Sequence, residues 1–236
     1  GEDVRIAPLV MGDTFTLASK VLGETRRINV FRPALYDDSL TVRLPVIYMP
    51  DGGVGEDFPH VAGLVQIGSL NGTMRPCLLV GIENTQRRRD MTGPTENPED
   101  RKIAPKVGES AAFRRFLREE LIPTIEARYR TTSERALVGE SLAGLFVMET
   151  FFLQPDLFDT YLAFDPSLWW NREALLQGAE ARLRAEPDLR KTLYFASSDE
   201  PGLVATAQKL SEILTRAAPP GLRWHYEPMP AETHGT

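Results

Sequence analysis

Short apolar runs that alternate with segments of helical periodicity constrain this 236-residue chain more than any other feature. A continuous apolar run of four to seven residues is typical of a strand buried on both faces. We expect strands at 25–31, 44–49, 77–82, 136–138, 161–164, 193–196 and 222–226. We expect helices at 61–70, 110–128, 142–153, 172–185 and 202–217. This alternation predicts an α/β fold with a mostly parallel central sheet and helices on both faces, as a single domain over residues 1–236.

One serine lies between a predicted buried strand and a predicted apolar helix. Ser141 follows the strand at 136–138 and precedes the helix at 142–153, with Gly139 and Ala143 two residues to either side. Small residues are needed there because the turn brings strand and helix backbones close together. This pattern predicts a nucleophile elbow at Ser141. The alternative is that Ser141 only caps the helix that follows.

Three histidines are present, so the general base can be chosen by elimination. His60 precedes Ser141, which is the wrong chain order for this fold, and His225 lies within a predicted strand. His234 follows the last strand on a polar loop, from which an imidazole can reach the strand ends. Its ordinary pKa near neutrality suits proton transfer in both directions. We therefore predict His234 as the base.

The acid that orients the base is expected after the penultimate strand. Asp199 and Glu200 follow the run at 193–196 and cannot be separated by sequence, although we favour Glu200. A third alternative is a Ser–His dyad whose imidazole is held by a backbone carbonyl. The oxyanion hole is expected to use the backbone N–H of Leu142, directly after the nucleophile, and that of Gly53. An ordinary tight turn at 51–53 is the alternative for the glycine.

Several segments together resemble the putative-esterase family of α/β-hydrolases, which includes esterase D, enterochelin esterase and the siderophore trilactone hydrolases. The resemblance rests on residues 46–52, 81–85, 89–90, 139–146, 165–170 and 232–235. It implies Ser141 as nucleophile, His234 as base, an acid near Glu200 and an oxyanion donor after Asp51-Gly52. Ala143 replaces the family's common glycine. The chain also stops two residues after His234, where relatives continue into a closing helix, so we expect that it lacks a C-terminal tail.

Arginine and tryptophan residues near the predicted strand ends are candidates for substrate binding. Arg87 or Arg89 can hold an anionic group by forked hydrogen bonds, the alternative being a solvated surface or ion pairs with nearby acids. Trp169 and Trp170 can wall an acyl or aromatic pocket, the alternative being core packing. The predicted activity is hydrolysis of a carboxylic ester, such as a siderophore-like lactone, a short acyl ester or an aryl ester, through an acyl-serine intermediate. Alternatives are an acyltransferase with the same intermediate and a catalytically silent binding protein.

Composition excludes several other classes of function. The formal net charge of −6 argues against nucleic-acid binding, which requires clustered Lys and Arg. The apolar runs are too short to span a membrane. The single cysteine, Cys77, rules out an intrachain disulfide and is expected in the core. No metal or organic cofactor is expected for this chemistry. The partner is a small-molecule ester, the oligomeric state is open, and the compartment is either cytoplasmic or, with a leader removed, exported.

Overall fold

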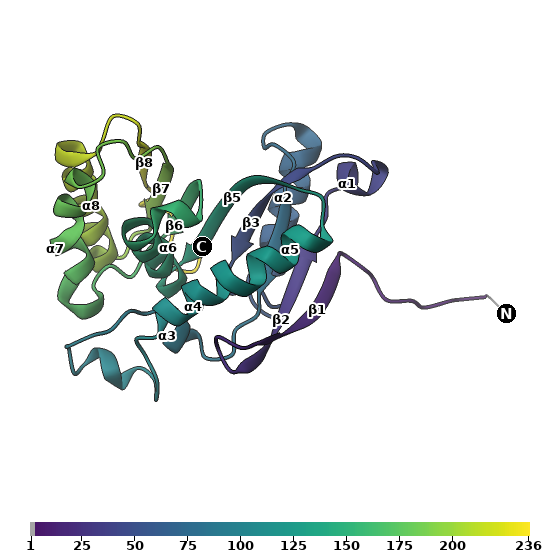
Figure 1. Ribbon diagram of the computed structural model, residues 1–236, viewed down its shortest axis with the longest axis horizontal. Helices are drawn as coiled ribbons and strands as arrows, with labels where there is room; N and C mark the ends of the chain where they lie inside the picture. The colour runs from purple at the N-terminus through teal and green to yellow at the C-terminus, as the bar shows by residue number, and fades with distance from the viewer. Residues whose placement is uncertain (1–2) are drawn as a thin grey trace.

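A computed structural model describes residues 3–236, with Gly1 and Glu2 outside the described residues. Its centre is an eight-stranded sheet of order β1-β2-β4-β3-β5-β6-β7-β8 (Figure 1). Pairs β1–β2 and β2–β4 are antiparallel, and all other neighbouring pairs are parallel. The strands are β1 (Asp13–Ser19), β2 (Glu24–Phe31), β3 (Leu44–Met49), β4 (Leu78–Ile82), β5 (Thr131–Glu140), β6 (Thr160–Phe164), β7 (Thr192–Ser197) and β8 (Arg223–Pro228).

Helices connect the parallel strands, as the alternating pattern predicts. They are α1 (Ala34–Asp38), α2 (Phe58–Asn71), α3 (Arg87–Asp90), α4 (Ser110–Phe116), α5 (Ile122–Arg128), α6 (Leu142–Leu153), α7 (Trp170–Arg184) and α8 (Pro201–Ala217). A π-helical turn, Leu117–Leu121, joins α4 to α5, so the helix predicted at 110–128 is present with an irregular middle. None of the helices in the described part of the chain is long and apolar enough to cross a bilayer.

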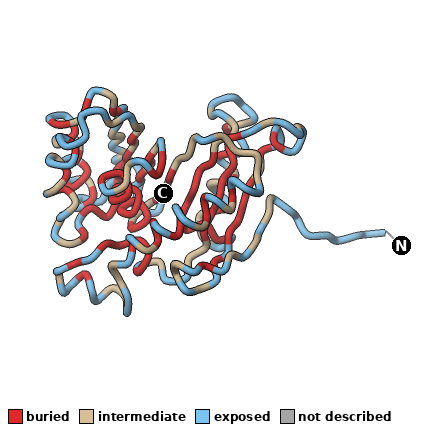
Figure 2. The backbone as a smooth tube through the Cα atoms, in the orientation of Figure 1, coloured by how far each residue is buried: buried red, intermediate tan, exposed pale blue. Residues whose placement is uncertain are grey.

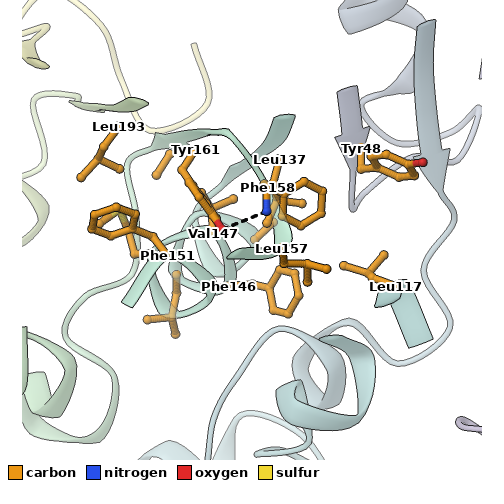
Figure 3. Packing of buried hydrophobic residues seen from close by; sticks show 14 of the residues in the cluster. Tyr48, Leu117, Leu137, Phe146, Val147, Phe151, Leu157, Phe158, Tyr161 and Leu193 are labelled. Carbon is orange, nitrogen blue, oxygen red and sulfur yellow. Dashed lines mark hydrogen bonds between the residues drawn. The ribbon is translucent and has the colours of Figure 1, made fainter. Parts of the chain in front are cut away.

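The two faces of the sheet carry separate hydrophobic clusters. Figure 2 shows in red the buried stretches of the backbone, which include the central strands. The larger cluster packs residues of α4 to α8 against one face. Phe146 and Phe151 of α6 lie beside Leu137 of β5 and Tyr161 of β6 in its centre (Figure 3). The smaller cluster packs α2 against Ile47 and other residues of β3 and β4 on the opposite face. Helices therefore cover both faces, and the predicted fold class is confirmed.

One strand was not predicted. β1 (Asp13–Ser19) pairs with β2 at the sheet edge, where polar and apolar residues alternate and most side chains are at least partly exposed. A two-faced edge strand lacks the continuous apolar run that marks the central strands. Cys77 lies in the smaller cluster, as expected.

The parallel arrangement brings distant segments of the chain to one edge of the sheet. Strands β3, β5, β6 and β7 run in the same direction, so their carboxyl ends lie side by side. The residues that follow these ends are therefore neighbours, although more than a hundred residues of sequence separate the first from the last. Ligand sites of such sheets form at this edge.

Candidate active site

Ser141 occupies a strained turn between β5 and α6. Its φ of 57° and ψ of −120° lie outside the regions that non-glycine residues usually adopt. Hydrogen bonds hold this conformation: the Ser141 N–H donates to the carbonyl of Phe164 at 2.9 Å, and its carbonyl accepts from the N–H of Leu145 at 2.9 Å. A Cβ at Gly139 would lie 2.6 Å from the Ala143 carbonyl oxygen, so that position requires glycine. The geometry is that of a nucleophile elbow.

His234 lies between Ser141 and a buried carboxylate. Its Nε2 is 3.1 Å from Ser141 Oγ, and its Nδ1 is 2.7 Å from Asp165 Oδ2. The His234 side chain is 41% exposed, whereas the Asp165 side chain is 7% exposed. The Nδ1 contact to a carboxylate favours the tautomer in which Nε2 is free to accept the serine proton. Serine, imidazole and carboxylate are thus aligned in one hydrogen-bonded row.

The carboxylate in this row corrects the sequence prediction, which named Asp199 and Glu200, and it also replaces the predicted alternative of a dyad held by a backbone carbonyl. Both predicted residues are exposed. The Asp199 N–H donates to the Glu232 carbonyl, and Glu200 occupies the N-cap position of α8, where its side chain makes no capping hydrogen bond. The carboxylate that contacts His234 follows β6 instead of β7. Since β6 lies directly beside β5, its end is the nearer of the two to Ser141.

The signal for Asp165 was present in the sequence. It is the first residue after the apolar run 161–164, which was itself predicted as a strand, and it adopts a φ of 47° that turns the chain sharply at the strand end. Its carboxylate also accepts hydrogen bonds from the N–H of Ser198 at 2.8 Å and from the hydroxyl of Ser198 at 2.5 Å. The loop after β7 therefore holds the Asp165 carboxylate in place without supplying a carboxylate to His234.

The two predicted oxyanion donors differ in their availability. Leu142 begins α6, and within residues 3–236 its N–H has no hydrogen-bond partner. The Gly53 N–H donates to Glu56 Oε1 at 2.8 Å, so it is engaged within its own loop. This loop approaches the sheet closely: a Cβ at Gly52 would lie 2.2 Å from the backbone nitrogen of Ile82. Gly53 can serve an oxyanion only if the Glu56 carboxylate moves away.

Two of the predicted substrate-binding residues lie in the protein interior. The Arg89 side chain is 8% exposed, and its Nε and Nη2 donate to Asp90 and Glu24 at 2.8 and 2.7 Å. Trp170 is buried, and its Nε1 donates to the Gly93 carbonyl at 2.8 Å. The prediction that either residue contacts substrate is wrong, because their polar atoms are used to anchor the loop after β4.

The other two predicted substrate-binding residues are accessible. Trp169 is 41% exposed and lies four residues after Asp165. Arg87 is 30% exposed, and its guanidinium pairs with both carboxylate oxygens of Asp51, at 2.7 and 3.0 Å. Its Nη2 also donates to the carbonyl of Glu140, the residue before Ser141, at 3.3 Å. Arg87 is therefore beside the elbow, although its charge is already paired.

Negative charge surrounds this arginine. Burial raises the pKa of Glu140, and the nearby carboxylates of Asp57 and Asp51 raise it further. Burial likewise raises the pKa of Asp57, with repulsion from Asp51 adding to it. Burial alone lowers the pKa of Arg87, but pairing with Asp51 outweighs it, so the net shift is upward. The guanidinium therefore remains charged within an acidic surrounding.

A cavity of about 550 Å³ reaches the site from the α2 face of the sheet. Apolar side chains line most of it, including Met49 of β3, Val65 of α2 and Leu162 of β6. Asp165 and His234 are among its lining residues. In the described chain no group of three or more His, Cys, Asp or Glu side chains is arranged to hold a metal ion.

Comparison of the chain with known proteins identifies its family. Residues 19–219 match the family model described as "Esterase: Putative esterase". The chain belongs to the putative-esterase family. Among solved structures, this esterase-family chain is similar to an IroE-like serine hydrolase from Shewanella oneidensis, with 33% identity, a TM-score of 0.80, and coverage of 94% of this chain and 75% of that one.

Relatives in this family include proteins named as siderophore esterases. The chain is 37% identical over 116 residues to ferri-bacillibactin esterase BesA of Bacillus subtilis, covering 43% of this chain and 40% of the relative. It is 31% identical over 202 residues to the siderophore triacetylfusarinine C esterase of Aspergillus fumigatus, covering 77% of this chain and 64% of the relative. The chain thus spans less than two thirds of the length of either curated relative.

Proposed function

We propose that this chain is a serine esterase that hydrolyses carboxylic esters through an acyl-Ser141 intermediate. The observation that carries the proposal is the row Ser141 Oγ, His234 Nε2, His234 Nδ1 and Asp165 Oδ2, with separations of 3.1 and 2.7 Å at its two contacts. Nucleophile, base and orienting acid within hydrogen-bond reach are the arrangement that acyl transfer requires. Membership of the putative-esterase family supports the same chemistry.

Each member of the row has one role in this mechanism. His234 Nε2 takes the proton of Ser141 Oγ as that oxygen attacks the ester carbonyl, and it returns the proton to the leaving alcohol oxygen as the acyl–oxygen bond breaks. Water then attacks the acyl-serine carbonyl, with His234 again accepting and returning a proton, and a carboxylic acid leaves. Asp165 remains anionic, fixes the imidazole tautomer and stabilises the imidazolium.

The tetrahedral intermediate needs donors for its oxyanion. The Leu142 N–H lies directly after the nucleophile without an intramolecular partner in the described chain, so we assign it as the first donor. Gly53 is the proposed second donor, in the conformation in which Glu56 has withdrawn. Removing one such donor in a serine hydrolase lowers kcat by about 10²- to 10³-fold.

The proposed substrates are siderophore-like lactones or related short acyl and aryl esters. This class is proposed because relatives of the chain are named as esterases of ferri-bacillibactin and triacetylfusarinine C. Trp169 supports it, since its exposed indole, four residues after Asp165 in the chain, offers a flat apolar surface for an aromatic or acyl group.

The test combines covalent labelling with turnover. The protein is incubated with a fluorophosphonate and digested for mass spectrometry, and hydrolysis of p-nitrophenyl esters and of a siderophore trilactone is followed in parallel. Ser141→Ala and His234→Ala are compared with Ser133→Ala and His225→Ala, which replace exposed residues outside the row. Labelling confined to Ser141 and turnover lost only in the first pair are expected. If the unaltered protein shows neither labelling at Ser141 nor ester turnover, the proposal is refuted.

A further inference from the structure

Arg87 connects the two segments that supply the proposed oxyanion donors. Its Nε and Nη2 donate to Oδ1 and Oδ2 of Asp51, in the loop after β3, at 2.7 and 3.0 Å. Its Nη2 also donates to the Glu140 carbonyl, at the end of β5, at 3.3 Å. Among the hydrogen bonds of residues 3–236, those of Arg87 join the 50–57 loop to the elbow. One guanidinium thus joins Asp51, two residues before Gly53, to Glu140, the residue before Ser141.

Asp51 is held by several contacts in a conformation that it would not keep alone. Its φ of 56° lies in the left-handed region, which is unfavourable for a residue other than glycine. Its carboxylate accepts from Arg87 and, at 2.6 Å, from Asn84 Nδ2, while its carbonyl accepts from the Asp57 N–H at 2.9 Å. The side chain is 8% exposed. Removing the arginine would leave a buried carboxylate with one side-chain partner fewer and a strained turn less restrained.

The surroundings of Arg87 do not favour an anionic ligand. Its charge is balanced by Asp51, and Glu140 and Asp57 add further negative charge nearby. Three of its five N–H groups are engaged in the contacts to Asp51 and Glu140. An anionic ligand would therefore have to approach the carboxylates of Asp57 and Glu140, while the charge of Arg87 is already paired with Asp51. The planar fork suits a carboxylate and a carbonyl held together, which the single ammonium of a lysine cannot match.

We propose that Arg87 is a positioning residue, which acts through Asp51 and the Glu140 carbonyl to hold the oxyanion loop in register with the nucleophile elbow. The inference rests on the proposed function. The reacting groups of an enzyme must be placed to within about 1 Å, and misplacement of that size costs up to about 10² in rate. We call the contacts of Arg87 with Asp51 and with the Glu140 carbonyl the latch. Loss of the latch therefore lowers kcat, for charged and neutral esters alike, and has little effect on the affinity for the substrate.

The experiment measures kcat and KM for one neutral and one carboxylate-bearing p-nitrophenyl ester. Arg87→Gln removes the fork, Arg87→Lys keeps the charge without it, and Asp51→Asn removes the partner charge while retaining a residue that tolerates the left-handed conformation. Arg88→Gln is the matched control, because Arg88 lies on the same short helix, is exposed, and donates to the Ile103 carbonyl instead. Thermal melting shows whether each variant is folded. If Arg87→Gln does not fold, Arg87→Lys and Asp51→Asn still test the proposal.

Arg87→Gln and Asp51→Asn are expected to lower kcat for both esters by a similar factor of about 10 to 100, with KM changed by less than about 3-fold. The double variant should be little worse than either single variant, because both changes break one latch. The kcat of Arg87→Lys should lie between that of Arg87→Gln and that of the unaltered protein. The kcat of Arg88→Gln should equal that of the unaltered protein. A rise in KM confined to the anionic ester would overturn the proposal in favour of substrate binding. Unchanged kcat in folded variants would also overturn it.

Failure of the proposed function gives a different result. If the unaltered protein neither hydrolyses the esters nor labels at Ser141, the serine-esterase assignment fails and the positioning role fails with it. If the unaltered protein is active and the latch variants are equally active, only the positioning role is refuted.

Discussion

His234 Nδ1 and Asp165 Oδ2 lie 2.7 Å apart, although 69 residues separate them in the chain. If Asp165 is the orienting acid, Asp165→Asn should lower kcat by about 10³- to 10⁴-fold, because the amide favours the wrong tautomer of the imidazole. The measurement is steady-state hydrolysis of a p-nitrophenyl ester across the pH range.

Asp199→Asn and Glu200→Gln are the controls for this prediction, since both residues are exposed and, in the described chain, neither side chain is hydrogen-bonded to His234. They should retain kcat within a few-fold of the unaltered protein. A large fall in kcat in Glu200→Gln, with little fall in Asp165→Asn, would show that Glu200 is the acid, as we favour from the sequence.

The contact between Glu56 and Gly53 predicts an unusual gain of activity. Glu56 Oε1 accepts from the Gly53 N–H at 2.8 Å, so this carboxylate competes with the oxyanion for the same donor. Glu56→Ala should therefore raise kcat several-fold if Gly53 is the second donor. Glu56→Gln, which removes the charge and keeps an acceptor, should give a smaller gain. A fall in kcat without a change in Tm would show that Glu56 holds the loop in its active shape.

Burial of Glu140 predicts a pH-dependent effect on stability. Burial raises the pKa of this carboxyl above its ordinary 4.5, and the carboxylates of Asp57 and Asp51 raise it further. The folded protein therefore binds the proton more tightly than the unfolded chain, and the associated stability is lost as pH rises through the raised pKa. Glu140→Gln should raise Tm at about pH 8 and have little effect at about pH 4, near and below that ordinary value.

Differential scanning calorimetry at both pH values checks this prediction. Glu186→Gln, at an exposed position, controls for the loss of one surface charge. A lower Tm for Glu140→Gln at the higher pH would mean that the ionised carboxylate makes a favourable contact that outweighs its burial.

The neighbouring tryptophans should respond to substitution in opposite ways. Trp170→Phe leaves the Gly93 carbonyl without its 2.8 Å donor, so the free energy of unfolding should fall by about 1–3 kcal/mol. Trp169→Ala removes a side chain that is 41% exposed, so Tm should change little while KM for an aryl ester rises several-fold. Chemical denaturation and ester kinetics on both variants separate the two effects. Equal KM values in Trp169→Ala and the unaltered protein would remove Trp169 from the substrate site.

The sequence predicts the central strands and the elbow because each is encoded locally. Apolar runs such as 44–49 and 193–196 carry their own burial signal, and the small residue at Gly139 marks the turn at Ser141. The edge strand β1 gives no comparable signal, because one of its faces meets solvent. Asp165 was not among the candidate acids because the acid was expected after the penultimate strand. The spatial order of the strands, which decides which strand end lies nearest to Ser141, is a property of the whole sheet.

Burial of charged side chains is equally hard to predict from local sequence. Arg89 stands in a run of three arginines that reads as a solvated surface, yet its partner Glu24 lies 65 residues earlier, on β2. The pairing of Arg87 with Asp51 spans 36 residues in the same way. In each case the contact depends on which strands become neighbours, so short-range patterns identify the arginines as candidates without showing which of them reach solvent.

The two hydrogen bonds from Ser198 give the loop after β7 a part in placing the Asp165 carboxylate. The Ser198 N–H donates to Oδ1 at 2.8 Å and its hydroxyl to Oδ2 at 2.5 Å, so both carboxylate oxygens are tied to the end of a neighbouring strand. Rotation of this carboxylate away from His234 would break those contacts as well as the one to Nδ1. Exchanging Ser198 for alanine would remove one restraint while leaving Ser141, His234 and Asp165 in the sequence, so the alignment of the row can change through a residue outside it.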